Sequence, residues 1–144
     1  MSTNKFKLEL PSFSSNEAFA RVTVAAFVSQ LDPTVDEIAD IKTSVSEAVT
    51  NSIVHAYPDS IGMIYISCEL SGNELKVKIR DKGKGIENVK QAMEPLYTTG
   101  GEERAGLGFA VMESMMDSLK VRSRLGKGTT VTMKKKIGVR EYVG

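Results

Sequence analysis

The stretch Glu47-Ala-Val-Thr-Asn51-Ser-Ile-Val-His55 sets a carboxylate, an amide and an imidazole at four-residue steps. Steps of this length place side chains on one face of an α-helix. Much later in the chain, Asp81-Lys-Gly83-Lys-Gly85 follows an alternating strand pattern, and Gly106-Leu107-Gly108-Phe109 comes further on. In this order, the three segments predict one nucleotide site assembled from distant parts of one domain.

The residues around these segments predict a layered fold. We expect strands at about 5–10, 62–70, 74–80, 119–124 and 129–137, and helices at about 15–31, 35–56, 87–93 and 107–118. Ser14 with Glu17, and Thr34 with Glu37, have the spacing of capping boxes at two helix starts. Because the helices cluster apart from the hairpins, the expected class is α+β. The expected architecture is a two-layer α/β sandwich with a mostly antiparallel sheet and helices on one face.

The composition excludes several classes of protein. The 144 residues fit one domain spanning 1–144, and the net charge of +1 argues against a dedicated nucleic-acid binder. The single cysteine excludes an internal disulfide, and no apolar run approaches the roughly 20 residues that span a bilayer. The first ten residues lack the apolar segment of a signal peptide. We therefore expect a cytoplasmic protein with no direct nucleic-acid partner and no membrane partner.

The helical motif favours a hard cation over zinc. Zinc sites need three or four His, Cys or carboxylate ligands, and the chain has one His. Magnesium takes oxygen ligands and is completed by substrate phosphates, so Asn51 can bind Mg²⁺ through its amide oxygen. Glu47 lies one turn earlier, where a water or hydroxyl can attack. Considered alone, the motif favours a solvated polar helix face over a ligand site.

The glycine motifs indicate a ligand pocket only in combination. Asp81 at a strand end can accept a hydrogen bond from an exocyclic amine such as that of adenine, and Gly83 and Gly85 allow close backbone approach. The alternative is an ordinary turn. The segment contains neither a Rossmann fingerprint nor a Walker P-loop. The run Lys134-Lys135-Lys136 indicates a protected edge strand.

Gly106-Leu107-Gly108 is expected to precede a helix, whose N-terminus would suit phosphates. The preceding loop contains Thr98, Thr99 and Arg104, which could supply hydroxyl donors and a γ-phosphate contact. The alternative is a plain surface loop followed by a helix start.

Together the motifs resemble the ATP-binding domain of the GHKL family over roughly residues 35–132. The resemblance implies a Bergerat fold with ATP under a mobile lid and Mg²⁺ as a cofactor. It implies Glu47 as general base, Asn51 as Mg²⁺ ligand and Asp81 as adenine reader. The remaining nucleotide contacts that it implies are Gly83, Gly85, Ile86, Thr98, Thr99, Arg104, Gly106, Leu107, Gly108 and Thr130.

Within that family, the segments Phe19-Ala-Arg21-Val-Thr-Val-Ala-Ala-Phe27 and Ser46-Glu47-Ala-Val-Thr-Asn51 are similar to those of sporulation anti-sigma F kinases. This resemblance implies a homodimer that binds a sigma factor of the F type and phosphorylates a serine of an anti-anti-sigma factor. Arg21 would meet both partners. Two alternatives stay open: a stress-response anti-sigma B type of kinase, and a module that senses ATP and sequesters a partner without useful catalysis.

Overall fold

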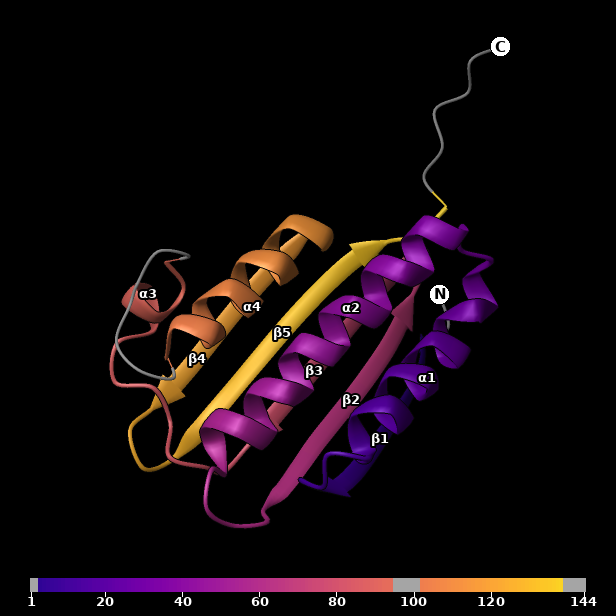
Figure 1. Ribbon diagram of the computed structural model, residues 1–144. Helices are drawn as coiled ribbons and strands as arrows, with labels where there is room; N and C mark the ends of the chain where they lie inside the picture. Colours follow the sequence, from indigo (N-terminus) through magenta and orange to yellow (C-terminus); the bar gives the residue numbers. More distant parts are fainter. Residues whose placement is uncertain (1–2, 95–101, 139–144) are drawn as a thin grey trace.

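The protein is an antiparallel sheet covered on one face by helices (Figure 1). The computed structural model describes residues 3–94 and 102–138, and residues 102–106 through their backbone alone. The strands are β1 (Thr3–Pro11), β2 (Met63–Ser71), β3 (Glu74–Asp81), β4 (Ser118–Arg124) and β5 (Gly128–Lys136). They lie in the order β1-β2-β3-β5-β4, and each neighbouring pair is antiparallel. The predicted α+β sandwich is confirmed.

The helices form the second layer, with α2 between α1 and α4 (Figure 1). They are α1 (Asn16–Val28), α2 (Val35–Asn51), α3 (Val89–Ala92) and α4 (Glu102–Met115). A 3₁₀ turn at Ser29–Leu31 extends α1, and a π-helical turn at Ser52–Ala56 extends α2. None of the described helices is both long enough and apolar enough to cross a membrane.

The capping box at the start of α2 is confirmed. The Glu37 amide donates to the Thr34 hydroxyl at 3.1 Å, and the Thr34 amide donates to the Glu37 carboxylate at 2.8 Å. This reciprocal pair satisfies two backbone N–H groups that the first helical turn leaves without partners. It fixes where α2 begins, and therefore where Glu47 and Asn51 lie along it.

The capping box predicted from Ser14 and Glu17 is wrong. No side chain caps α1, and the Glu17 amide donates to the backbone carbonyl of Ser14 instead of its hydroxyl. The Glu17 carboxylate turns along the helix to pair with Arg21 at 3.1 Å. The side-chain amide of Asn16 donates to the Pro11 carbonyl at 2.9 Å. The start of α1 is therefore bonded to the end of β1 and is not capped by a side chain.

One core lies between the two layers. Strand alternation buries every second side chain of the sheet against the apolar faces of the helices. The larger fully buried members are Ile41, Val45, Ile64, Ile66, Leu75, Ile79, Phe109, Met112 and Met133. Each such side chain contributes roughly 1.5–3 kcal/mol on burial. Cys68 is in this core, and burial raises the pKa of its thiol to about 12.

The run Lys134-Lys135-Lys136 does not form an edge strand, so that prediction was wrong. It lies in β5, which pairs with β3 on one side and β4 on the other. The ammonium of Lys135 is turned toward the helices, where it donates to the Met115 carbonyl at 2.7 Å and lies 3.7 Å from the Asp40 carboxylate. The other two lysines are exposed on the face of the sheet that the helices leave open.

Candidate functional site

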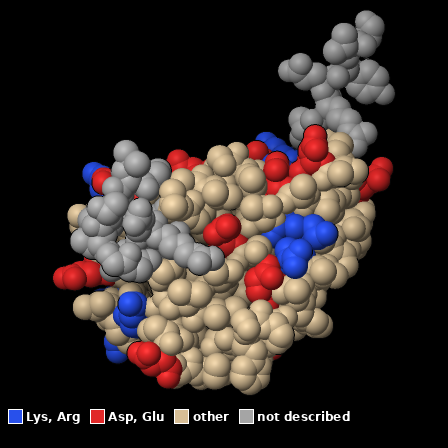
Figure 2. Space-filling view, viewed as in Figure 1, with Lys and Arg blue, Asp and Glu red and all other residues tan. Residues whose placement is uncertain are grey.

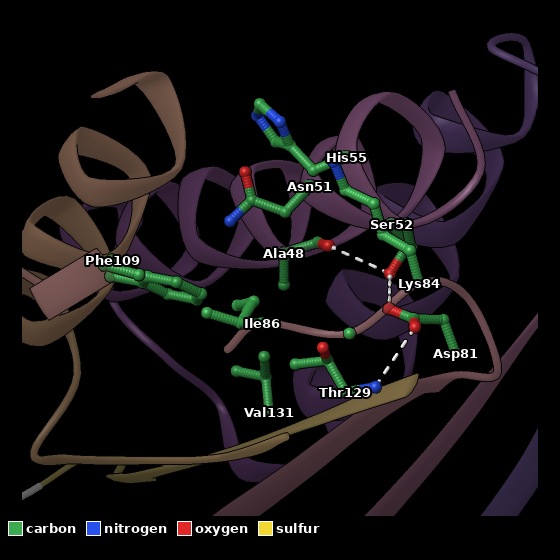
Figure 3. A pocket seen from close by; sticks show the side chains of 13 residues that line it. Ala48, Asn51, Ser52, His55, Asp81, Lys84, Ile86, Phe109, Thr129 and Val131 are labelled. Atoms are coloured by element: carbon green, nitrogen blue, oxygen red, sulfur yellow. Dashed lines mark hydrogen bonds between the residues drawn. The ribbon is translucent and has the colours of Figure 1, made fainter. Parts of the chain in front are cut away.

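A cavity of about 260 Å³ opens between α2, α4 and the adjoining ends of β3 and β5. Figure 3 shows its lining, in which apolar side chains surround a few polar groups. The lining residues are Ala48, Asn51, Ser52, His55, Ala56, Asp81, Lys84, Gly85, Ile86, Ala92, Phe109, Thr129 and Val131. A largely apolar cavity with few convergent polar groups is typical of a small-molecule site.

Asp81 lies at the floor of the cavity and is 5% exposed. One carboxylate oxygen accepts from the amides of Gly83 and Thr129, both at 3.1 Å. The other accepts from the Ser52 hydroxyl at 3.0 Å, and Figure 3 shows the bonds to Thr129 and Ser52. Burial raises the pKa of Asp81, and these three donors act in the opposite direction. The carboxylate is thus held in one orientation by backbone and hydroxyl donors, with lone pairs left for a ligand.

Ser52 was not predicted as a site residue. It is 4% exposed, and its hydroxyl also lies 3.5 Å from the Ala48 carbonyl. The π-helical turn begins at this residue, and the Tyr57 amide donates five residues back to the Ser52 carbonyl at 3.2 Å. Such wide turns occur frequently at functional sites.

The two glycines after Asp81 are needed for close backbone packing. A Cβ on Gly83 would collide with the Ala56 carbonyl, where the π-helical turn ends. Gly85 has a φ of 75°, and a Cβ there would collide with the Arg124 carbonyl. Gly85 also lines the cavity, whereas Gly83 acts indirectly through the amide that it donates to Asp81. Ile86 lines the cavity as predicted from the resemblance.

Asn51 lines the other end of the cavity, and Glu47, one turn earlier on α2, lies beside it without lining the cavity. A Cβ built on Gly108 would lie 3.0 Å from a Glu47 carboxylate oxygen and 3.4 Å from the Asn51 amide nitrogen. Gly108 is buried, so its missing side chain lets α4 approach the polar face of α2. The buried Asn51 amide nitrogen has no hydrogen-bond partner among the described residues. An unsatisfied buried amide beside a carboxylate indicates a place prepared for a polar ligand.

The predicted helix start at Leu107 is wrong, because α4 begins at Glu102. Gly106, Leu107 and Gly108 therefore lie inside the helix and do not form its N-terminus. Leu107 is 50% exposed and does not line the cavity. Arg104 lies in the first turn of α4, where only the backbone is described. Thr98 and Thr99 lie outside the described residues.

The prediction of Thr130 near the cavity is also wrong, because the residue one position earlier takes that place. Thr129 is 9% exposed, lines the cavity and donates its amide to Asp81. Thr130 pairs with Arg80 and Arg122 and faces the opposite side of the sheet. Successive strand residues point to opposite faces of the sheet. Moving one position along the strand therefore takes the side chain from the cavity to the open face.

The donor set suits a nucleotide with a magnesium ion better than a metal held by protein alone. Among the described side chains, those of residues 3–94 and 107–138, no three from His, Cys, Asp or Glu come together around a metal position. Magnesium commonly takes one or two protein ligands and completes its shell with phosphates and water. The amide of Asn51, with Glu47 beside it, meets that requirement once a polyphosphate is present.

Comparisons with known proteins agree with this geometry. Residues 14–135 match the family model of the histidine kinase-like ATPase domain. The anti-sigma F factor of Thermoanaerobacter sp. (strain X514) is 57% identical over 137 residues, covering 94% of this chain and 96% of the relative. The anti-sigma F factor of Clostridium beijerinckii is 57% identical over 141 residues, covering 96% and 99% respectively.

The fold has a counterpart among solved structures. A crystal structure of the RsbU and RsbW domains of a Mycobacterium tuberculosis protein superposes with a TM-score of 0.69 at 19% identity. The match covers 93% of this chain and 32% of that one. At this identity the likeness shows the fold alone.

Proposed function

The chain belongs to the anti-sigma F factor family and carries a histidine kinase-like ATPase domain, and from this premise we propose that it is an ATP-dependent protein serine kinase. Residues 1–144 act as one nucleotide-binding unit. The protein binds a sigma factor of the F type and transfers the γ-phosphoryl group of ATP to a serine of an anti-anti-sigma factor. The high identity to anti-sigma F factors favours this type over the stress-response type.

The observation that carries this proposal is the buried Asp81 carboxylate with its three fixed donors. It presents an acceptor at the floor of an otherwise apolar cavity, which is the complement of the exocyclic amine of adenine. Ile86, Phe109 and Val131 supply apolar walls for the faces of the base (Figure 3). Adenine would therefore lie at the Asp81 end, and the phosphates would extend toward Glu47 and Asn51.

Phosphoryl transfer would take place at the end of the cavity where α2 and α4 meet. Glu47 precedes Ser52 by five residues, so it lies roughly 7.5 Å nearer the N-terminus of α2 than the adenine end. Asn51 would hold Mg²⁺, which when bound neutralises charge on the β- and γ-phosphates. Glu47 would accept the proton of the partner's serine hydroxyl. The rest of catalysis is positioning of the γ-phosphate against that hydroxyl.

The test is phosphoryl transfer by the Glu47→Gln variant. With Mg²⁺, γ-labelled ATP and the anti-anti-sigma protein, we expect phosphoserine formation to fall roughly 10²–10⁴-fold, because a positioned general base contributes about that factor. Nucleotide affinity, measured by calorimetry, should change little. The matched control is Glu113→Gln, which alters an exposed carboxylate on α4. Loss of nucleotide binding in Glu47→Gln would instead make this carboxylate structural.

The same assay separates the two classes of function. Nucleotide binding by the unsubstituted protein without phosphoserine on the partner would refute the kinase. It would leave a module that senses ATP and sequesters its partner.

Partner binding would involve the outer face of α1. Phe19 and Val22 are more than half exposed there, and Arg21 lies between them in the sequence. Exposed apolar side chains beside a cation are typical of a protein interface. We assign this face to the sigma factor and to the anti-anti-sigma factor, with a homodimer as the active form.

The Arg21→Glu variant tests that assignment. It should lower sigma-factor capture in a pull-down by at least tenfold at unchanged nucleotide affinity. Capture at the unsubstituted level would place the interface elsewhere. Dimerisation is checked independently by sedimentation equilibrium.

A further inference from the structure

The face of the sheet opposite the helices is a shallow basic hollow of about 1030 Å³. In Figure 1 the helices lie on one side of the sheet, and no described helix covers the other side. The cationic residues that line the hollow are Lys7, Lys76, Lys78, Arg80, Lys120, Arg122 and Lys134. One carboxylate, Glu9, lines it with them.

Strand alternation puts these cations together. In β3, Leu75, Val77 and Ile79 are buried in the core, and the residues between and after them point the other way. Lys76 lies directly opposite Lys134 in the pairing of β3 with β5. Like charges directly opposite one another destabilise a sheet. On its other side, in the pairing of β3 with β2, Lys76 lies opposite Glu69, which offsets part of this repulsion.

The net charge of the chain hides a separation of charge. The chain has 19 basic and 18 acidic residues, which gives +1. The seven basic residues and one acidic residue of the hollow contribute +6, so the remaining 12 basic and 17 acidic residues contribute −5. On the helix side, Figure 2 shows acidic side chains spread among a few isolated basic ones. An anionic partner would therefore be attracted to the open face.

The residues between the cations indicate which anionic partner fits. Protein interfaces have an apolar core with aromatic anchors. Tyr65 is the one aromatic residue lining the hollow, and the Arg80 guanidinium already lies 4.7 Å from its ring centroid. Interfaces with nucleic acids are more polar and more positive, and phosphates are contacted by Lys, Arg, Ser, Thr and Tyr. The hollow is lined by lysines and arginines together with serines, threonines and one tyrosine, which is the composition of a phosphate-binding surface.

The register adds a repeating pattern of donors. Thr132 of β5 has Lys78 directly opposite on one side and Lys120 directly opposite on the other. Strands lie roughly 4.8 Å apart, so the two lysines flank a hydroxyl over roughly 10 Å. We propose that this open face binds the phosphate backbone of a nucleic acid without reading its base sequence.

The experiment measures binding of labelled mixed-sequence oligonucleotides by fluorescence anisotropy, one single-stranded and one duplex, with saturating Mg·ADP. If all seven cations contact phosphates, a rise from 50 to 200 mM salt should weaken duplex binding by roughly 10³-fold or more. In the variant Lys78→Gln/Lys120→Gln/Lys134→Gln, the same rise should weaken it by roughly 10²-fold. The two oligonucleotides show whether a single strand or a duplex is preferred.

A matched control removes three cations elsewhere: Lys42→Gln/Lys90→Gln/Lys127→Gln, none of which lines the hollow. It should bind as the unsubstituted protein does. Both variants should melt no lower than the unsubstituted protein, and both should retain the nucleotide affinity because the cavity lies on the other face. Undetectable binding at 50 mM salt, or equal losses in the two variants, would overturn the proposal. So would equal affinity for polyglutamate, which would assign the face to an acidic protein.

Discussion

The two ends of the cavity are built differently. At the Asp81 end, a buried carboxylate accepts three hydrogen bonds from the protein and lies among apolar side chains. At the Glu47 end, a buried amide nitrogen lacks a partner among the described residues, and a glycine keeps a neighbouring helix close. At the Asp81 end, the protein itself supplies the hydrogen-bond partners. At the Glu47 end, a bound ligand would supply them.

Under the proposed function, this difference separates recognition of adenine from phosphoryl transfer. A base is recognised by fixed hydrogen bonds and flat apolar walls, which the core can supply in advance. A transferring phosphoryl group and its metal need ligands that change during the reaction, so unsatisfied groups are retained there. Substitutions at the two ends should therefore affect different measurements.

The largest effect on affinity is expected from Asp81→Asn. The amide can still accept from the Gly83 and Thr129 amides, but its NH₂ group would face the exocyclic amine of adenine. Losing a hydrogen bond to a charged acceptor costs about 1.5–3 kcal/mol, so calorimetry should show nucleotide affinity reduced roughly 10- to 100-fold.

The same substitution should leave the fold intact or stabilise it. Burial raises the pKa of Asp81, so the folded state favours the protonated form. The stability that protonation contributes is present in acid and is lost as the pH rises through the raised pKa. At neutral pH the neutral amide should therefore melt no lower than the carboxylate. A matched control is Asp59→Asn in an exposed turn, and a drop in affinity there too would contradict a specific role for Asp81.

Gly108→Ala addresses the other end and should have opposite effects on stability and turnover. Alanine favours helix over glycine by about 0.5–1 kcal/mol, so thermal stability should rise or hold. The added methyl would lie 3.0 Å from the Glu47 carboxylate and must displace it by a few tenths of an ångström. We expect transfer to fall about tenfold, since misplacement by 1 Å can cost about 10²-fold. Adenosine binding should be unchanged, and an equal loss of adenosine affinity would show that the ends are coupled.

The smallest effect is expected from Ser52→Ala, which removes one donor to Asp81. A neutral hydrogen bond contributes about 0.5–1.5 kcal/mol, and one to a charged group up to about 3. Nucleotide affinity should fall about three- to tenfold by calorimetry. Ser44→Ala is the matched control on α2, because the buried Ser44 hydroxyl has no partner among the described residues. The nucleotide affinity of the Ser44→Ala variant should be unchanged, and its melting temperature should not fall.

Local signals predicted the layered fold well. Strand alternation and the Thr34–Glu37 box depend on neighbouring residues alone, and the structure confirms both. Ser14 and Glu17 have the same spacing but form no capping box, because the Glu17 carboxylate pairs with Arg21 and the Asn16 side chain bonds to the Pro11 carbonyl. A spacing rule cannot weigh such competition.

The candidate site was predicted less completely, because its contacts join distant segments. Ser52 and Asp81 are 29 residues apart, so no pattern of neighbouring residues indicated that the Ser52 hydroxyl bonds to Asp81. Gly108 suggested a helix start but serves close packing of α4 against α2. Thr130 was implied by the resemblance, and a shift of one position along the strand placed the prediction on the wrong face of the sheet.

Cys68 makes the stability of this protein measurable under native conditions. It is the single cysteine of the chain, 1% exposed in the core, with a pKa raised by burial to about 12. Only a thiolate reacts with an alkylating reagent, so modification at neutral pH must wait for the core to open. The labelling rate of one thiol thus reports the opening equilibrium of the central strands, and a ligand that binds only the closed form should slow it in proportion to its occupancy.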